Sequence, residues 1–283
     1  MSNERDIKRR IKSVGSTRQI TKAMNLVAAS KLSRAKGAMD ETKPYTEEMR
    51  RLAAAICEGA AGISHRYLTE RREKQSVIIV IAGDRGLAGG YNTNVCKAAL
   101  EHMETEGRDE SVIAVGSKAR DFFVRRRKPI ERSFIGVIDS PYYGDAAEIG
   151  GHALTAFETG DTDAVYLAYT RFRSPISHEP EVIRLLPARA QRGGRDRHTE
   201  FDSDPEALID TIIPKYVNTV IYSAMLEASA SEQGARMISM DAATDNADEM
   251  IEGLTLKFNR ARQSAITQEI TEIAAGADLG SRS

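Results

Sequence analysis

Residues 76–103 read SVIIVIAGDRGLAGGYNTNVCKAALEHM. The first part, SVIIVIA, is a run of β-branched residues typical of a strand that is buried on both faces of a parallel sheet. Glycines follow this run, and a segment with a helical pattern follows the glycines. Strand, glycine-rich turn and helix in this order are the layout of a phosphate-binding turn. The stretch therefore predicts an α/β domain and raises the question of a nucleotide site.

The spacing of the glycines argues against that site. Gly83, Gly86, Gly89 and Gly90 give the pattern G-x-x-G-x-x-G-G, whereas a dinucleotide fold uses G-x-G-x-x-G and a P-loop ends in G-K-[ST]. No lysine is placed to reach the phosphates, and the acids about 20 residues further on fall within the expected helix. We interpret the four glycines as a structural turn that lets the backbone bend tightly, with no cofactor bound.

The alternation of strands and helices continues outward from this stretch. Strand-like runs (SVIAV, DAVYLAY and VIRLLP) alternate with helical ones (SKARDFFVRRR and DAAEIGGHALTAFE). This is the sequence form of a Rossmann-like α/β domain, which we assign to residues 76–190. The flanks at 59–75 and 191–204 are polar or rich in glycine, so we interpret them as linkers.

Both ends of the chain show a helical pattern instead, over residues 1–58 and 205–283. Their apolar residues recur in steps of three and four, as on one face of a helix. The N-terminal seam comprises Ile7, Ile11, Val14, Met24, Val27, Ala28, Leu32, Ala35, Met39, Met49, Leu52 and Ile56. The C-terminal seam comprises Ala243, Ala247, Ile251, Leu254, Phe258, Ala261 and Ala265.

Long helices of this kind need tertiary packing to be stable in water. We therefore expect the two terminal segments to pair as a long antiparallel coiled coil, with the α/β domain inserted between them. Pro44 should kink or interrupt the first helix, and Pro214 marks either a kink or a new helix start in the second.

Composition restricts the function. Forty Lys and Arg against 41 Asp and Glu give a formal net charge of −1, so the whole-chain balance does not point to nucleic acid. The two cysteines, Cys57 and Cys96, are too few for a disulfide scaffold and indicate a reducing compartment. No window approaches the roughly 18 apolar residues of a membrane span, so we expect membrane association only through partners. Catalytic motifs and metal-ligand spacings are also missing from the sequence.

Basic residues are concentrated near the N-terminus. Residues 5–36 contain a single acid, Asp6, and the basic residues Arg5, Lys8, Arg9, Arg10, Lys12, Arg18, Lys22, Lys31, Arg34 and Lys36. Such a pattern is typical of a solvated helix face or of a strip that meets an acidic partner. The stretch contains no aromatic residue, which disfavours single-stranded nucleic acid as that partner.

Two other classes of function stay open on these patterns. One is a basic coiled-coil tether or nucleic-acid-binding protein, whose binding should fall steeply with salt. The other is an enzyme with an α/β nucleotide domain and helical extensions, which dialysis against ATP and NAD would identify.

Four segments resemble the γ subunit of bacterial F-type ATP synthases. They are ITKAMNLVAASKLSRA at 20–35, DRGLAGGYN at 84–92, SEQGARMISMDAATDNADEMI at 231–251 and LKFNRARQSAITQEITEI at 256–273. The resemblance thus spans nearly the whole chain. It implies that the terminal helices form the shaft of a rotary motor, which couples ion flow through a membrane ring to ATP synthesis or hydrolysis at the β subunits. The α/β domain would lie at the foot of the shaft, and the subunit itself would be non-catalytic and bind no nucleotide.

The resemblance also implies partners and a location. The partners are the α and β subunits of the catalytic head, the ε subunit and the c-subunit ring, with no nucleic acid. The implied location is the cytoplasmic face of the bacterial plasma membrane, as a peripheral protein. The coupled ion, proton or sodium, stays open because that choice belongs to the membrane ring.

Contact residues follow from the same resemblance. The implied rotor–stator contacts are Lys22, Met24, Lys31, Glu232, Arg236, Arg262, Gln263, Thr267 and Glu269. Glu232 and Arg236 lie four residues apart, so a pair on the helix surface explains them nearly as well. The C-terminal tip AITQEITEIAAGADLG fits an apolar bearing, except for Glu269 and Glu272.

Overall fold

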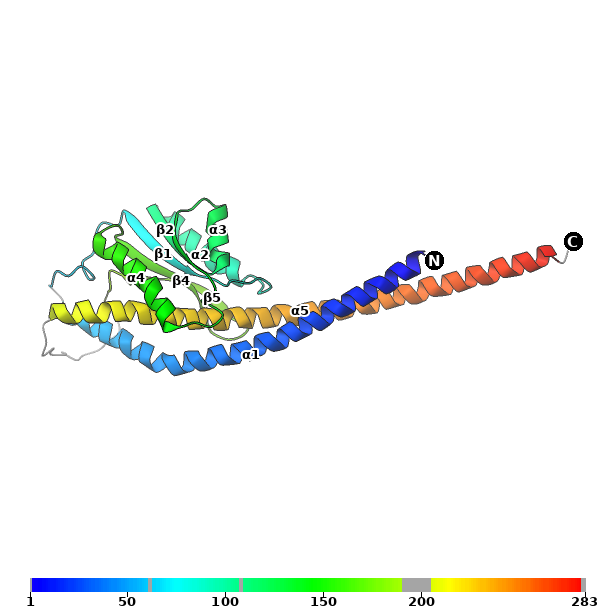
Figure 1. The fold of residues 1–283 in the computed structure, drawn as a ribbon, viewed down its shortest axis with the longest axis horizontal. Coiled ribbons are helices and arrows are strands. Elements are labelled where there is room, and N and C mark those ends of the chain that lie inside the picture. The colour runs from blue at the N-terminus through cyan, green and yellow to red at the C-terminus, as the bar shows by residue number, and fades with distance from the viewer. Residues whose placement is uncertain (1, 61–62, 107–108, 190–204, 281–283) are drawn as a thin grey trace. The chain divides into compact units, whose positions relative to one another are not determined.

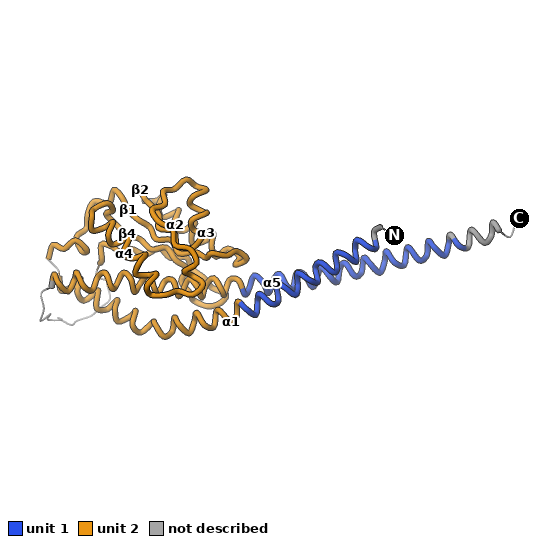
Figure 2. Tube along the Cα trace, in the orientation of Figure 1, with its two compact units in different colours: residues 1–27, 237–283 blue, residues 28–236 orange. Residues whose placement is uncertain are grey.

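The structure is a computed structural model that describes residues 2–60, 63–106, 109–189 and 205–280. In chain order its elements are α1 (Ser2–Gly59), β1 (Gln75–Ile81), α2 (Tyr91–Glu106), β2 (Asp109–Val115), α3 (Ser117–Arg125), β3 (Ile130–Phe134), α4 (Tyr143–Thr159), β4 (Ala164–Phe172), β5 (His178–Leu186) and α5 (Pro205–Gly280) (Figure 1). The chain divides into two compact units (Figure 2). Unit 1 is residues 1–27 with 237–283, and unit 2 is residues 28–236.

Unit 2 is built around a five-stranded sheet with the order β3-β2-β1-β4-β5. The strands β1, β2, β3 and β4 are parallel to one another. The edge strand β5 pairs antiparallel with β4. The central strand β1 is buried on both faces from Ser76 onward, as its β-branched sequence predicts. This confirms the Rossmann-like α/β domain.

Helices cover both faces of this sheet. Alternate side chains of β1 enter two separate cores, so that Ile78 and Val80 pack towards α2 and α3. Ile79 and Ile81 pack on the other face with α4 and with the parts of α1 and α5 that belong to unit 2. The helices that carry the terminal segments are therefore also core elements of the sheet domain.

One strand, β3, was not predicted from the sequence. The expected strand-like runs form β1, β2, β4 and β5, whereas β3 was not anticipated. Its sequence, IERSF, has an exposed centre and only Phe134 fully buried. An edge strand of this kind lacks the apolar alternation on which strand prediction depends.

The two long helices pass through their prolines. The helix α1 is continuous across Pro44, and α5 begins at Pro205 and continues across Pro214. The expected interruption at Pro44 and the new start at Pro214 therefore do not occur. A proline leaves the carbonyl four residues earlier without its amide partner. Those carbonyls belong to Asp40 and Asp210, both exposed residues, where water can bind them.

Unit 1 contains the antiparallel pairing of the two helices. Three contacts connect them in opposite chain directions. The Asn25 amide donates to the Met237 carbonyl at 2.9 Å, the Thr21 and Thr244 hydroxyls share a hydrogen bond of 2.8 Å, and Arg18 pairs with Asp248. As residue numbers fall along α1 they rise along α5, which confirms the expected antiparallel coiled coil.

The seam between these helices follows a repeat of 3.5 residues. On α1 the less exposed positions of unit 1 alternate steps of four and three: Ile7, Ile11, Val14, Arg18, Thr21 and Asn25. On α5 they are Met240, Thr244, Ala247, Ile251, Leu254, Phe258, Ala261 and Ala265. The expected C-terminal seam was correct from Ala247 to Ala265, but it had Ala243 where the repeat places Thr244, and it omitted Met240. The expected N-terminal seam wrongly included Val27 and Leu52, which are exposed by 57% and 38%, and it omitted the polar members.

Candidate functional site

The glycine turn between β1 and α2 is filled by the chain's own polar groups. Asp84 lies at its centre, where one carboxylate oxygen accepts the backbone N–H of Ser117 at 2.8 Å. The other accepts the N–H of Gly136 at 2.9 Å. The side-chain amide of Asn92 accepts the N–H of Gly83 at 2.7 Å. The amide of Gly83 at the start of the turn is thus already bonded within the chain, and the Asp84 carboxylate disfavours an anion beside it.

The four glycines of this turn differ in what they contribute. Gly89 has a positive φ of 54°, which side chains other than glycine rarely adopt. A side chain at Gly83 would come within 2.6–2.8 Å of the Glu232 carboxylate, whereas Gly86 faces open space. At Gly90 an added side chain would meet only the flexible amide of Asn94, at 3.1 Å.

Glu232 and Arg236 lie under this turn and are bonded to each other. They are 4% and 7% exposed, and the Arg236 guanidinium donates to the Glu232 carboxylate. The same nitrogen donates to the Gly86 carbonyl at 3.2 Å, which connects α5 to the turn. Burial raises the pKa of Glu232, and the hydrogen bond from Arg236 opposes that rise. The expected ion pair between Glu232 and Arg236 is therefore present, but both side chains are buried and do not lie on the exposed surface of the helix.

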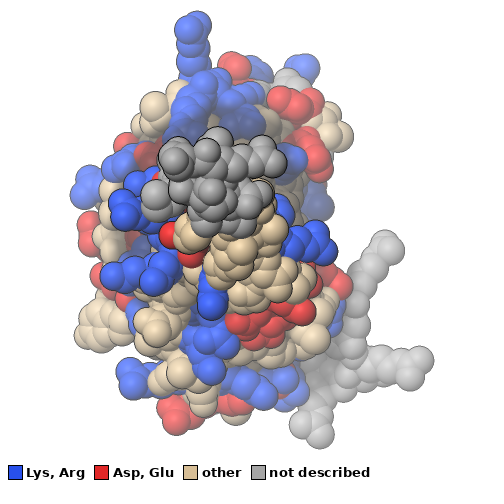
Figure 3. Space-filling view, turned by 90° about the vertical axis from the view of Figure 1, so that its right-hand side faces the viewer, with Lys and Arg blue, Asp and Glu red and all other residues tan. Residues whose placement is uncertain are grey.

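The N-terminal contact candidates have different surroundings. Lys22 is exposed and Met24 is half-buried. Lys31 instead forms an ion pair within unit 2, because its Nζ donates to both oxygens of Asp139 at 2.6 and 2.7 Å. In the view from the right-hand side of Figure 1, Lys and Arg gather in several patches between uncharged and acidic residues (Figure 3).

Replacing Lys31 by Met should raise the pKa of Asp139 towards its ordinary value. The pKa is lowered chiefly by the hydrogen bond from Lys31. A carboxyl group with a lowered pKa adds stability above its unfolded pKa and loses it as the pH falls through the folded pKa. The pair is partly exposed, so its contribution at neutral pH is about 0.2–1 kcal/mol.

The measurement is the pH titration of the Asp139 carboxyl carbon by NMR, in the wild type and in Lys31→Met. Lys22→Met is the matched control, because it removes an exposed charge of the same kind. An unchanged Asp139 titration in Lys31→Met would show that the pair does not persist in solution.

The C-terminal contact candidates all lie on the exposed surface of α5. They are Arg262, Gln263, Thr267 and Glu269. Among them, the Thr267 hydroxyl donates to the Gln263 carbonyl at 2.9 Å, which is a bond within the helix. The side chain of Glu272 lies outside the described residues. Among the nine candidates, the described side chains of Glu232 and Arg236 are bonded to each other. Asp139, the partner of Lys31, lies close enough to interact electrostatically with that pair.

Apolar side chains also lie exposed on this part of α5. Ile266, Ile270 and Ile273 are 43%, 61% and 67% exposed. Their spacing of four and three puts them on one face of the helix. The sequence analysis recognised this tip as apolar but did not identify the stripe.

Groups suited to catalysis have no corresponding arrangement. Within residues 2–60, 63–106, 109–189 and 205–280, no cluster of three or more His, Cys, Asp or Glu could hold a metal ion. Burial raises the pKa of Cys57 to about 11 and that of Cys96 to about 12, so neither thiol is an activated nucleophile. None of the described helices is long and apolar enough to cross a membrane.

Known proteins resemble this chain over nearly its full length. A family model described as ATP synthase matches residues 3–278. The ATP synthase gamma chain of Alkaliphilus metalliredigens is 44% identical over 281 residues, which are 96% of this chain and 97% of the relative. The sodium-ion-specific ATP synthase gamma chain of Acetobacterium woodii is 40% identical over 297 residues, with 98% of each chain covered.

Solved structures agree in fold. A chain of the Euglena gracilis mitochondrial ATP synthase rotor, in rotational state 1, has a TM-score of 0.68 at 17% identity and covers 94% of this chain and 99% of its own. A chain of the Tetrahymena thermophila mitochondrial ATP synthase central stalk and c ring has a TM-score of 0.62 at 22% identity, with 79% and 99% covered.

Proposed function

This chain belongs to the family of ATP synthase gamma chains, and from that premise we propose how its paired helices act in a rotary ATP synthase. Its role is that of the central-stalk rotor subunit. The observation that carries the mechanism is the antiparallel pairing of α1 and α5 in unit 1, which gives two helices one common axis. We propose that this pair turns inside the head of α and β subunits, where the ATP chemistry takes place, and is itself non-catalytic.

The finer partners are part of the proposal. They are the α and β subunits, the ε subunit and the c ring, with the protein held peripherally at the cytoplasmic face of the bacterial plasma membrane through the complex. The family relation supports these partners. The alternative of a nucleic-acid tether has only the basic strip in its favour, and that strip also fits acidic loops of a protein head.

Weak contacts suit a shaft that meets each copy of a head site in turn. Exposed ion pairs contribute only about 0.2–1 kcal/mol each, so exposed bases such as Lys22, Arg34 and Arg262 can be guided by acidic loops without being trapped. The apolar stripe of Ile266, Ile270 and Ile273 supplies non-directional contacts, which fits a bearing. Glu232 and Arg236 are buried in unit 2, and we propose a structural role for them in place of stator contact.

Co-purification tests the proposed assembly. A tagged chain isolated from membranes in mild detergent should bring down the head subunits, ε and the c ring, together with ATP hydrolysis. Partners that dissociate steeply with salt and prove to be nucleic acid would favour the tether. Isolation of the chain without head subunits would contradict the rotor assembly.

Replacing Met24 by Lys should impair coupling more than hydrolysis. The half-buried, unbranched side chain of Met24 adapts to a changing surface. A lysine there would pair with an acidic group of the head at one angular position, by a charge-assisted bond of about 1.5–3 kcal/mol. That bond would lower the free energy of the rotor at one rotation angle and so raise the barrier to leaving it. We expect an assembled complex that still hydrolyses ATP, a lower ratio of pumping to hydrolysis, and a raised temperature dependence of turnover.

The test measures ATP-driven pumping and hydrolysis in the same inverted vesicles. Met24→Leu is the control, because it keeps an apolar side chain of similar volume and should preserve the ratio. If Met24→Lys also preserves the ratio, or prevents assembly, Met24 is not a sliding contact with the head.

A further inference from the structure

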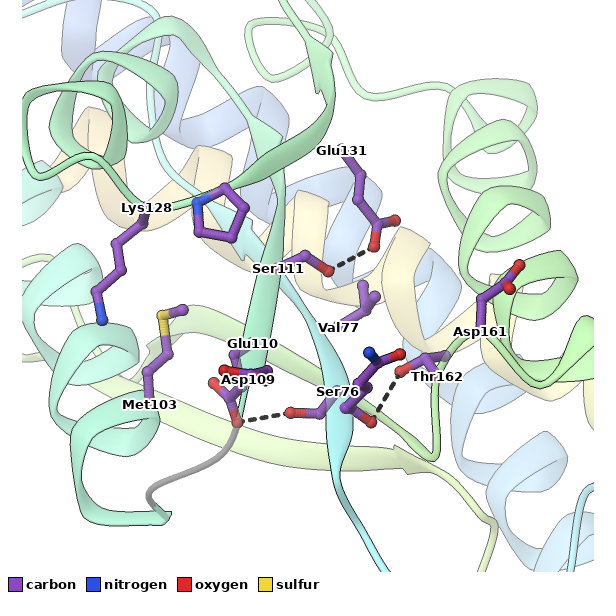
Figure 4. A pocket seen from close by; sticks show the side chains of 12 residues that line it. Ser76, Val77, Met103, Asp109, Glu110, Ser111, Lys128, Glu131, Asp161 and Thr162 are labelled. Carbon is purple, nitrogen blue, oxygen red and sulfur yellow. Dashed lines mark hydrogen bonds between the residues drawn. The ribbon is translucent and has the colours of Figure 1, made fainter.

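Unit 2 contains an acidic pocket of about 430 Å³ at the amino-terminal ends of its parallel strands (Figure 4). Four carboxylates line the pocket: Asp109, Glu110, Glu131 and Asp161. Lys128 also belongs to the lining. The sequence analysis singled out none of these residues. Acidic side chains at a protein surface are usually solvated and indicate no ligand. Glu110, which is buried, is therefore the residue that points to a ligand in this pocket.

Glu110 is a buried carboxylate with only one oxygen bonded. Its side chain is 0% exposed. Oε1 accepts a hydrogen bond of 2.8 Å from the hydroxyl of Ser76, which is its register partner on β1. Oε2 is buried and has no hydrogen-bond partner among the described residues. Buried charged oxygens are normally bonded or paired with a cation, because burial removes them from water.

Among the described residues, the groups around Glu110 do not supply the missing donor. His102 Nε2 lies 4.0 Å from Glu110 Oε1, beyond hydrogen-bond distance, and has no partner of its own among the described residues. Its ring packs against Tyr166, with the ring centres 4.4 Å apart. The hydroxyl of Ser111 already donates to Glu131.

We propose that this pocket binds a guanidinium or primary ammonium group through Glu110. Both groups bring N–H donors and a positive charge, which are what Glu110 Oε2 lacks. The acids at the rim favour a cation, and a volume of this size falls in the range of small-ligand sites. Because Glu110 is covered, a ligand must displace a neighbour, and Met103 on α2 is the adaptable side chain of the lining.

Two sources share this chemistry. One is a free polyamine, and the other is a lysine or arginine side chain of another subunit of the complex. The proposal goes beyond the rotor function, because it uses none of the rotor–stator residues and does not depend on rotation.

The first test titrates the full chain with agmatine, a small guanidinium compound with a primary amine, by calorimetry. We expect saturable binding that Glu110→Gln weakens by about tenfold or more, which is about 1.4 kcal/mol. Asp161→Asn is the matched control at the exposed rim and should change the affinity by less than about threefold. Absence of saturable binding, or equal affinity of Glu110→Gln and wild type, would overturn the proposal.

The second test needs no substitution. A fluorescent primary amine and a carbodiimide are added to the isolated chain and to the intact complex, and the adduct on Glu110 is identified by mass spectrometry. Labelling of both, blocked by methylguanidine, which has no primary amine to compete in the coupling, indicates a free cation as the natural ligand. Labelling of the isolated chain alone indicates that a partner's basic side chain fills the pocket. No labelling of either would show that Glu110 is inaccessible and that the proposal is wrong.

Discussion

Replacing Arg236 by Met is expected to destabilise the chain by about 3–5 kcal/mol, because it leaves the buried carboxylate of Glu232 without its charged partner. Arg236 also donates to the Gly86 carbonyl, so the loss should loosen the glycine turn as well as α5. Urea unfolding measures the stability, and amide hydrogen exchange over residues 83–91 measures the local loosening. Arg262→Met, at an exposed position of the same helix, is the control and should change stability by less than about 0.5 kcal/mol.

The pH dependence of this variant has a definite sign. Burial raises the pKa of Glu232 and Arg236 lowers it, so Arg236→Met should raise that pKa further. A carboxyl group with a raised pKa costs stability as the pH rises through its folded pKa. The deficit of Arg236→Met should therefore be smaller at about pH 5 than at about pH 8.

A second substitution separates the charge from the packing. In Glu232→Gln/Arg236→Met no buried charge is left unpaired, so the deficit should fall to about 1–3 kcal/mol, the cost of an unsatisfied neutral polar group. A double variant as unstable as Arg236→Met alone would mean that the arginine acts by packing and not by its charge.

Replacing Gly116 by Ala is the second change with a large expected effect. Gly116 follows β2 and has a φ of 93°, and its added Cβ would lie 2.1 Å from the carbonyl oxygen of Ala82. Ala82 and Gly116 directly follow the neighbouring strands β1 and β2, and the Ala82 amide is bonded to the Val115 carbonyl at 2.9 Å. Their backbones therefore cannot move apart without disrupting the end of the sheet. The backbone strain costs about 1–3 kcal/mol, and the collision adds to it, so we expect the sheet domain to fail to fold at ordinary temperature.

Two other glycines provide matched controls for this prediction. Gly136 has a φ of 83° but open space around it, so Gly136→Ala should cost only the backbone strain, about 1–2 kcal/mol. Gly86 has open space and no positive φ, so Gly86→Ala should be neutral or stabilise by about 0.4–1 kcal/mol. Thermal melting of the three variants should give that order. A folded Gly116→Ala as stable as Gly136→Ala would contradict the collision.

The sequence predicted those parts of the fold in which hydrophobicity alone sets the structure. The central strand β1 could be recognised because it is apolar on both faces, and the C-terminal seam from Ala247 onward because its members there are apolar. The strand β3 could not, because at the sheet edge only Phe134 is fully buried. The N-terminal seam was incomplete for the same reason, since Arg18, Thr21 and Asn25 occupy seam positions by bonding across to α5.

Contacts between residues that are far apart in the sequence could not be predicted from the sequence. Gly116 follows Ala82 by 34 positions in the sequence (116 − 82), and no spacing rule connects the two residues. Likewise Glu232 and Arg236 have the spacing of a surface pair, and only the position of the turn over α5 buries them. The spacing of four residues correctly predicted that Glu232 and Arg236 are bonded to each other. It could not predict that they are buried, because the turn that covers them lies far away in the sequence.

The repeat of 3.5 residues along the seam of unit 1 gives the rotor a chirality of its own. Helices with this repeat wind around each other in a left-handed sense. Torque applied in that sense presses the seam side chains together, and torque in the opposite sense draws them apart. Close-packed interiors resist compression strongly, whereas separation gives up dispersion contacts that are individually weak. The helix pair is therefore an elastic element whose torsional stiffness differs between clockwise and anticlockwise drive.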